Sequence, residues 1–350
     1  MGMVLVPYSA WGHVAPMLAV AGQLVRRGIP VRMIAGARYR QAIETTGAVA
    51  VVPPVDHRVR VPAGHGPADL AERGMLRWQR RAAWRSTATT MAAELRSTST
   101  ELCVIDPHIP WARGLAERHG VRAVPMWSTH ARRAGQGPVL INTLPELQPN
   151  RSRFGPEAHF VGPLLSTVPL EPSTVDWTRF GDRVLVVSPG TVFTRSAEFF
   201  RGIAAAFAGS EWTVVLATAQ MPVAELGSLP DNVIAHRWIP QLEVLRRAQV
   251  FVTHAGINSV HEAILAGVPM VCAPRIREQR LTAALLRDLG IGAPMASGRR
   301  LRDQVDRLSS DIVVHKVVRE LRDRALAAAG AERAADVVQN ALRARVAALG

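Results

Sequence analysis

Residues 238–279 carry the residue types that could bind a phosphorylated ligand. The apolar run 250–253 predicts a buried strand, a glycine-containing turn follows it, and Ser259 predicts the start of a helix. A strand, turn and helix in this order present free backbone N–H groups and the positive end of a helix dipole to an anion. His254 and Asn258, together with Ser259, would add side-chain donors around that anion. The stretch therefore predicts a diphosphate site.

Four further side chains of this stretch could contact other parts of a nucleotide ligand. Trp238 lies in a Pro-flanked turn, where an indole offers a flat surface to a base, although a tryptophan is more often a core residue. Glu262 follows Ser259 at capping-box spacing, so it could bind a ligand hydroxyl or act as a cap, which is the commoner role. Glu278 and Gln279 follow a predicted strand, and in a loop there they should point into a cleft and could bind sugar hydroxyls.

His13 and Asp106 could form a general base and its orienting partner. His13 lies near the start of the helix expected over 15–27, and a helix N-terminus favours the neutral imidazole, which can accept a proton. A lone histidine at such a position is more often structural or solvent-exposed. Asp106 follows the apolar run 102–105, whose carboxyl end should lie at the same sheet edge as the loop after the first strand. An aspartate there could fix the tautomer of the imidazole, or it could cap the helix that follows Pro107.

The formal net charge of +14 raises the question of an anionic partner such as nucleic acid or a membrane surface. Nearly all of the positive charge is arginine, since Lys316 is the only lysine, and the arginines are spread along the whole chain. The sequence contains no zinc-finger pattern, aromatic RNA-binding signature or basic tail. We therefore predict no nucleic-acid partner, while a nucleotide ligand would still benefit from the positive field.

Size, cysteine usage and the N-terminus indicate the class of protein. A chain of 350 residues, 48% of them hydrophobic, is expected to form two domains of ordinary size. Cys103 and Cys272 lie in apolar stretches without a metal-binding pattern, so we interpret both as small core residues in reducing surroundings. The first residues lack the features of a signal peptide, and no run approaches the roughly 18 apolar residues of a membrane-spanning helix. We expect a soluble, cytoplasmic protein.

Apolar runs alternate with helix-like segments in the first half of the chain, which is the sequence form of βαβ units. Residues 53–67 are rich in Pro, Gly and His and predict a loop. Strands are expected at 4–7, 31–35, 49–52, 102–105, 123–127 and 139–142, with helices at 15–27, 39–46 and 69–97.

A second series of the same kind follows a Pro-rich segment at 162–178. The chain is therefore predicted to be an α/β protein with two doubly wound domains facing each other across a cleft, which would bind ligands at the carboxyl ends of their strands. We place an N-terminal domain over 1–165, a linker over 166–179 and a C-terminal domain over 180–350. In the second series, strands are expected at 183–187, 213–216, 233–235, 250–253 and 270–273, and helices at 199–207, 242–247, 259–266, 280–289 and within 310–349.

Together, the motifs of residues 238–279 resemble the donor signature of the UDP-glycosyltransferase superfamily. The turn THAGINS, followed by EA, GVPM and P-x-x-x-EQ, is similar in particular to the macrolide glycosyltransferase branch of bacterial natural-product enzymes. The resemblance covers almost the whole chain and implies the GT-B fold, in which two Rossmann-like domains face each other across a cleft. It leaves open that the terminal helices pack back on the N-terminal domain.

The resemblance also implies roles for the residues of the donor site. Trp238 would stack on the nucleobase, and Gln241 and Glu262 would contact the ribose, so that a ligand role takes precedence over capping for Glu262. Glu278 and Gln279 would bind the sugar. The diphosphate would be held by His254, Gly256, Asn258 and Ser259, and by Thr191 of the SPGT turn at 188–191.

The opening motif PYSAWGHVAP resembles the catalytic loop of the family through its GHVxP pattern. The resemblance implies that His13 deprotonates the acceptor hydroxyl and that Asp106 is its partner. The activated hydroxyl would then displace the nucleotide diphosphate directly at the anomeric carbon, with inversion. The co-substrate is a UDP- or dTDP-linked sugar, and no metal or other cofactor is implied. The donor region agrees, since it offers neither a DxD pair nor a cluster of oxygen ligands.

Five tryptophans of the N-terminal domain could supply apolar surface to the acceptor, although most could equally be core residues. The family points to a hydrophobic natural product such as a macrolide or another polyketide. Two of the five share a helix with several arginines, an arrangement that could equally lie on an anionic membrane, so a lipid-linked acceptor stays open. The five are Trp11, Trp78, Trp84, Trp111 and Trp127.

The chain departs from the family pattern at two places. Only a short connector joins the strands between residues 130 and 139, where relatives carry helices that wall the acceptor pocket, and Thr282 stands where the motif has asparagine. A non-catalytic partner of another transferase and a nucleotide-sugar epimerase therefore remain alternatives. The first would need neither His13 nor Asp106, and the second would need carboxylates on both faces of the sugar. Either a monomer or a homodimer is expected.

Overall fold

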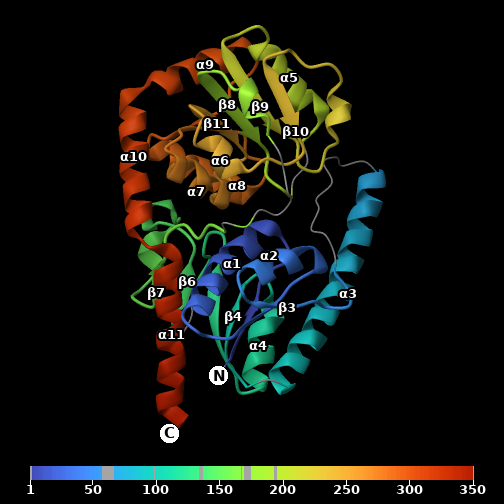
Figure 1. Ribbon diagram of the computed structural model, residues 1–350, viewed down its shortest axis with the longest axis vertical. Coiled ribbons are helices and arrows are strands. Elements are labelled where there is room, and N and C mark those ends of the chain that lie inside the picture. The colour runs from blue at the N-terminus through green and yellow to red at the C-terminus, as the bar shows by residue number, and fades with distance from the viewer. Residues whose placement is uncertain are drawn as a thin grey trace. The chain divides into compact units, whose positions relative to one another are not determined.

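The protein consists of two compact units (Figure 1). The first unit contains the described residues up to 168 together with 328–349, and the second contains 175–327. Much of the linker predicted at 166–179, and most of the loop predicted at 53–67, lies outside the described residues. The computed structural model describes residues 2–56, 67–97, 99–133, 137–166, 168, 175–192 and 195–349.

The first unit is built on a seven-stranded parallel sheet in the order β3-β2-β1-β4-β5-β6-β7. The strand order reverses between β1 and β4, and these two strands end level because Val6 pairs with Ile105. Sheets of this type bind ligands where the order reverses, beyond the carboxyl ends of the strands. The strands are β1 Gly2–Val6, β2 Val31–Ile34, β3 Val49–Val51, β4 Thr100–Ile105, β5 Arg122–Trp127, β6 Val139–Ile141 and β7 Ala158–Phe160.

Helices cover both faces of this sheet because successive strand residues face two different apolar cores. On β1, Met3 and Leu5 face the core that contains α1 and α11. Val4 and Val6 face the core that contains α3 and α4. Val338 of α11 is buried in the first of these cores, so the last helix packs on the first unit. The helices are α1 Trp11–Arg26, α2 Arg40–Thr45, α3 Pro67–Ser97, α4 Pro110–Arg118 and α11 Gly330–Leu349.

The second unit contains a six-stranded parallel sheet in the order β10-β9-β8-β11-β12-β13. Its order reverses between β8 and β11, which end level because Ser188 pairs with Thr253. The strands are β8 Arg183–Ser188, β9 Trp212–Ala217, β10 Val233–His236, β11 Val250–Thr253, β12 Met270–Cys272 and β13 Gly292–Pro294. The helices are α5 Ala197–Phe207, α6 Gln241–Leu245, α7 Ile257–Ala266, α8 Arg277–Asp288, α9 Arg299–Ser310 and α10 Ile312–Ala327. Short 3₁₀ helices lie at Ala37–Tyr39, Pro145–Leu147, Arg151–Arg153, Trp177–Arg179 and Val223–Leu226.

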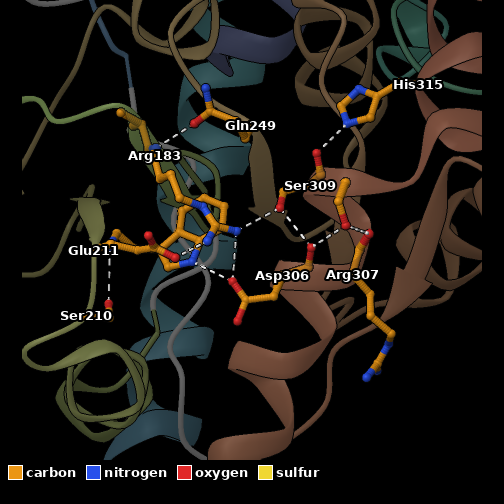
Figure 2. Close-up of polar contacts among 11 residues, drawn as sticks. Arg183, Ser210, Glu211, Gln249, Asp306, Arg307, Ser309 and His315 are labelled. Atoms are coloured by element: carbon orange, nitrogen blue, oxygen red, sulfur yellow. Dashed lines mark hydrogen bonds and ion pairs between the residues drawn. The ribbon is translucent and has the colours of Figure 1, made fainter.

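A polar network at the amino end of β8 ties this strand to α9 (Figure 2). Arg183 lies over the Trp212 ring at 4.2 Å and forms an ion pair with Asp306 at 2.9 Å. It forms a second ion pair with Glu211. Asp306 also accepts a hydrogen bond from Trp212 Nε1 at 2.8 Å. Because Ser188 lies at the other end of β8, the network stabilises this unit away from the edge where the sheet can bind a ligand.

The prediction of two parallel α/β units is confirmed, and the predicted strands and helices recur with boundaries that shift by a few residues. Three elements have no counterpart in the sequence prediction. β7 and β13 are short edge strands, which leave little apolar pattern to detect. α9 buries only Leu301 and Val305 among charged neighbours, so its apolar stripe is narrow.

Candidate functional site

The reversal point of the first sheet brings His13 and Asp106 into contact. His13 lies in the first turn of α1, directly after β1, and Asp106 directly follows β4. His13 Nδ1 lies 2.6 Å from Asp106 Oδ2, and the Asp106 side chain is fully buried. When the carboxylate is ionised, the proton of this bond sits on Nδ1 and Nε2 keeps a free lone pair. The pair thus has the geometry of a general base and its orienting partner.

Two residues that sequence reasoning missed complete the surroundings of the Asp106 carboxylate. His108 Nδ1 lies 2.9 Å from Oδ1, and the His108 backbone N–H donates to the same oxygen at 2.8 Å. Ser128, after β5, donates its hydroxyl to Oδ2 at 3.2 Å. Burial raises the pKa of Asp106, but the charges and hydrogen bonds of His13 and His108 outweigh it and hold that pKa well below its usual range. The Asp-Pro pair before His108 is a turn signal that could have indicated the first contact.

The helix-capping alternative for Asp106 is wrong. α4 begins at Pro110 with Ile109 as its N-cap, and no side chain caps it. The Asp106 side chain instead forms a local turn with the His108 backbone N–H. Its carboxylate is therefore available to orient His13.

The same three side chains could in principle hold a cation. The ligand atoms of His13, Asp106 and His108 lie within 4.8 Å of one another, and two imidazoles with a carboxylate form a ligand set that zinc accepts. Both Nδ1 atoms, however, hydrogen-bond the carboxylate at 2.6 and 2.9 Å. A cation between them would displace these protons and occupy the base. The arrangement fits a base and its partner better than a metal centre.

A hollow in the first unit lies beside this pair of residues. Its lining includes Ile105, which precedes Asp106, and Pro125 and Trp127 of β5. The Trp127 ring also contacts the His108 ring edge-on, with centroids 5.7 Å apart. A parallel crossover is normally a dozen or more residues long and usually a helix, whereas the described residues between β5 and β6 include no helix. The hollow is lined by residues of β4, β5 and β6, so it lies on this part of the sheet.

The structure does not gather the five tryptophans predicted for the acceptor. Trp11 stacks on Tyr39 in one core with centroids 6.3 Å apart, Trp111 packs in the opposite core, and Trp127 lines the hollow. Trp84 and the 70% exposed Trp78 lie on α3. No described helix is long and apolar enough to cross a membrane. Of the five, Trp127 alone lies beside the His13–Asp106 pair by the contacts above, and the acceptor role of all five stays a prediction.

The reversal point of the second sheet brings together the residues predicted to hold a diphosphate. The N-cap of α7 is Gly256, which has no side chain to occupy the N–H groups of the first turn. Ala255 before it has a φ of 59°, a left-handed conformation that costs an alanine about 1 kcal/mol or more. The turn therefore holds the start of α7 in one orientation, with its N–H groups pointing beyond the carboxyl end of β11.

His254 packs between two glycines of this turn region. A Cβ added to Gly190, in the turn after β8, would come within 2.6 Å of the imidazole, and one added to Gly256 would clash with it as well. Burial and the nearby Arg195 lower the pKa of His254 to about 4, so the ring is neutral at physiological pH. A neutral imidazole can bind an anion as a hydrogen-bond donor, without contributing charge. Thr191 and Asn258 lie in the same turns and are partly exposed.

The two residues predicted to contact a ribose hydrogen-bond each other. Gln241 Nε2 donates to Glu262 Oε2, and Ser259 Oγ lies 3.4 Å from the same nitrogen. Burial raises the pKa of Glu262 to about 7, and the hydrogen bond from Gln241 opposes that rise. No described hydrogen bond ties Glu262 to the start of α7, so the capping role is wrong for it. Trp238 follows β10 and is partly exposed, as a base-stacking residue must be.

The loop predicted for Glu278 and Gln279 is instead the first turn of α8. The Gln279 side chain is buried, and its Oε1 accepts hydrogen bonds from the N–H groups of Arg275 and Ile276 at 2.8 and 3.3 Å. This oxygen satisfies backbone donors at the start of the helix, so it orients the turn. Glu278 is partly exposed in that turn. Contact of the pair with a sugar stays a prediction.

Comparison with known proteins places the chain among glycosyltransferases. The family model described as UDP-glucoronosyl and UDP-glucosyl transferase matches residues 150–299, which include every predicted donor residue. The NDP-glycosyltransferase YjiC of Bacillus licheniformis is 27% identical over 382 residues, covering 94% of this chain and 95% of that protein. The oleandomycin glycosyltransferase of Streptomyces antibioticus is 35% identical over 170 residues, or 47% of this chain and 40% of that protein.

Solved structures extend the likeness to the whole chain. The crystal structure of CalG4, the calicheamicin glycosyltransferase, is similar with a TM-score of 0.80 and 27% identity, and the match covers 99% of both chains. The glycosyltransferase of kitacinnamycin gives a TM-score of 0.81 at 24% identity, covering 97% of this chain and 98% of that one, which shows the shared GT-B fold. The similarity thus includes the first unit, with its His13–Asp106 pair, as well as the second.

Proposed function

Since this chain belongs to the UDP-glycosyltransferase superfamily and is a glycosyltransferase, we propose that it transfers a sugar from a nucleotide diphosphate to a hydroxyl group of a hydrophobic natural product, with inversion and without a metal ion. The hydrogen bond of 2.6 Å between His13 and the buried Asp106 is the observation that carries this proposal. It supplies a base in the first unit, while the second unit supplies a site for the leaving group.

The chemistry follows from the state of this hydrogen bond. His13 Nε2 takes the proton of the acceptor hydroxyl as the oxygen attacks the anomeric carbon, and the ionised Asp106 stabilises the imidazolium that forms. The bond between the anomeric carbon and the diphosphate breaks, and its electron pair stays on the phosphate oxygen. A single displacement of this kind inverts the anomeric configuration. General-base assistance of this type contributes about 10²–10⁴-fold in rate.

The donor site supports departure of a diphosphate without a metal ion. The N–H groups at the start of α7 and the neutral His254 ring can hydrogen-bond phosphate oxygens, and the helix dipole adds a partial positive charge. Trp238 would stack on the base, and the Gln241–Glu262 pair would receive the ribose hydroxyls. Thr191 and the first turn of α8 complete the site toward the phosphate and the sugar. The nucleobase is uracil or thymine.

A hydrophobic acceptor is supported by the hollow beside Asp106 and by the names of relatives. The hollow is lined mainly by apolar side chains, including Trp127 and Val139, and its lining contains Ile105 and Pro107, the two chain neighbours of Asp106. The oleandomycin glycosyltransferase and the demethyllactenocin mycarosyltransferase of Streptomyces fradiae are named for natural-product acceptors. We propose the same broad class for this chain.

Incubation with UDP-glucose or dTDP-deoxysugars and a panel of polyketide aglycones tests the proposal. Transfer to an aglycone, retained in EDTA, is the expected result, and the product should have the inverted anomeric configuration. The variants His13→Ala and Asp106→Asn should lose most of the transfer while they still bind nucleotide. His119→Ala, at the C-cap of α4, serves as the control. Nucleotide binding without turnover would instead identify a non-catalytic partner, and isomerised donor without acceptor would identify an epimerase.

A further inference from the structure

Arg195 occupies the carboxyl edge of the second sheet, where no role was predicted for it. It directly precedes Ser196, the N-cap of α5. Its guanidinium donates a hydrogen bond to the Ala273 carbonyl, directly after β12, and lies over the Phe199 ring at 4.6 Å. The side chain is thus held from two sides at the edge that also carries the turns of Gly190 and His254.

The positive charge of Arg195 has no partner among the described residues. Its Nε is buried without a hydrogen-bond partner, and the structure describes no ion pair for its guanidinium. The nearby charge is the positive Arg275 guanidinium, which together with burial lowers the pKa of Arg195. Arg195 in turn helps to lower the pKa of His254. Two guanidinium groups, Arg195 and Arg275, and the neutral His254 ring therefore lie near one another, and the field of the two charges favours an anion.

A purely structural role does not account for this arrangement. A buried N–H group without a partner is destabilising, and the half-buried guanidinium has no counter-ion among the described residues to offset its partial loss of hydration. A methionine could fill the same volume against Phe199 without either cost. The energetic cost therefore points to a ligand that supplies both the missing acceptor and the missing negative charge.

We propose that the Arg195 guanidinium binds the diphosphate of the donor and stabilises it as it leaves. The inference rests on the proposed function, because it assigns a further residue to the same donor site. As the bond to the anomeric carbon breaks, negative charge grows on the phosphate oxygen, and a fixed guanidinium can hydrogen-bond two such oxygens at once. The proton from the acceptor goes to His13 Nε2, and Arg195 stays protonated throughout. The side chain supplies positive charge of the kind that a divalent cation supplies at other phosphoryl sites.

Titration calorimetry of UDP, UMP and uridine separates a contact to the phosphates from a contact to the nucleoside. Wild-type protein should bind UDP more tightly than uridine. Arg195→Met should weaken UDP binding by about 10–100-fold, the effect of one charge-assisted hydrogen bond, and should leave uridine binding unchanged. Arg195→Lys keeps the charge but loses the two-pronged geometry, so its UDP affinity should lie between those of the wild type and Arg195→Met. Arg201→Met is the matched control, because Arg201 lies on α5, the helix that follows Arg195, in an exposed ion pair with Glu198.

Thermal unfolding of the same variants distinguishes binding from packing. If Arg195 binds the ligand, Arg195→Met should unfold at the same or a higher temperature, because a buried N–H group without a partner and a half-buried unpaired charge have been removed. A lower melting temperature together with an equal loss of UDP and uridine affinity would overturn the proposal, as would unchanged UDP affinity. If the wild-type protein binds neither UDP nor dTDP, the donor class of the proposed function is refuted. The role of Arg195 is then refuted as well, because no diphosphate is present for it to bind.

Discussion

Replacing His108 with phenylalanine should slow sugar transfer without preventing nucleotide binding, because His108 holds the carboxylate on which His13 depends. His108 Nδ1 lies 2.9 Å from Asp106 Oδ1, and the His108 backbone N–H donates to the same oxygen at 2.8 Å. Phenylalanine fills a similar volume and keeps the backbone donor. The substitution therefore removes a single hydrogen bond to the carboxylate.

The expected size of the effect follows from the burial of Asp106. A hydrogen bond to a charged group contributes about 1.5–3 kcal/mol, and no water can replace the lost donor at a side chain that is 0% exposed. The carboxylate would keep His13 and Ser128 as side-chain partners but could rotate away from its present orientation. If the whole loss falls on the transition state, kcat decreases about 10–150-fold while the KM for the donor is unchanged.

The pH dependence of kcat/KM should also change in His108→Phe, because the substitution changes the pKa of Asp106. Burial raises that pKa, and the charges and hydrogen bonds of His13 and His108 lower it by more. Without His108 the pKa of Asp106 rises, so the carboxylate is protonated at a higher pH. Protonation removes the orienting partner of His13, and the acid limb of kcat/KM should move to higher pH. The stability that the ionised carboxylate contributes, present above its unfolded pKa, is then lost earlier as the pH falls.

Steady-state kinetics across roughly pH 4 to 9 measure both effects. His108→Asn should restore much of the rate, since its amide nitrogen can donate from nearly the position of Nδ1. His119→Phe, elsewhere in the first unit, controls for the loss of a histidine as such. An unchanged kcat and an unmoved acid limb in His108→Phe would show that His13, Ser128 and the backbone hold the carboxylate without His108, and the reasoning would fail.

Three further outcomes are expected. Burial raises the pKa of Glu262 to about 7, so the free energy of unfolding of the wild type should decrease as the pH rises from the unfolded carboxyl value through 7. In denaturant unfolding the decrease between pH 5 and 8 should be on the order of 1 kcal/mol, and Glu262→Gln should abolish it. Asp306→Ala breaks the network of Figure 2 and should destabilise the second unit by about 1–2 kcal/mol, read by thermal unfolding, with UDP affinity unchanged. EDTA should leave transfer unaffected, whereas added Zn²⁺ should inhibit it by binding His13, Asp106 and His108; equal zinc inhibition of His108→Phe would contradict that site.

The contact between His13 and Asp106 could be predicted from the sequence because strand ends are easy to place. His13 and Asp106 each follow a short apolar run, and parallel strands meet at one edge wherever their order reverses. The family motif then identified which residues at that edge matter. The second histidine could not be found in the same way, because it depends on a local turn after Asp106 and on the position of its own ring. Ser128 was missed for a related reason, since its contact requires the register of β5 beside β4.

The donor site shows where side-chain roles escape a sequence pattern. Glu278 and Gln279 look like loop residues after a strand, but the Gln279 side chain closes the start of α8 and so extends the helix back over both. Gln241 and Glu262 were assigned separately to one ribose, and their mutual hydrogen bond depends on how α6 and α7 pack. The tryptophans were grouped by type alone. Trp11 and Trp111 lie in different cores because α1 and α4 cover opposite faces of the sheet, which composition does not contain.

The charge of the donor site gives the most informative difference between pattern and structure. The motif identifies His254 as a diphosphate ligand, and a histidine at such a site suggests a cation. Packed between two glycines and beside a guanidinium, however, the ring has a pKa of about 4, so in the proposed site it would bind as a neutral donor. Positive charge for the proposed leaving group would then have to come from another side chain of the same unit. Arg195 lies outside the motif, yet it is half-buried, held in place and without a counter-ion among the described residues, and is therefore the side chain that we propose to supply that charge.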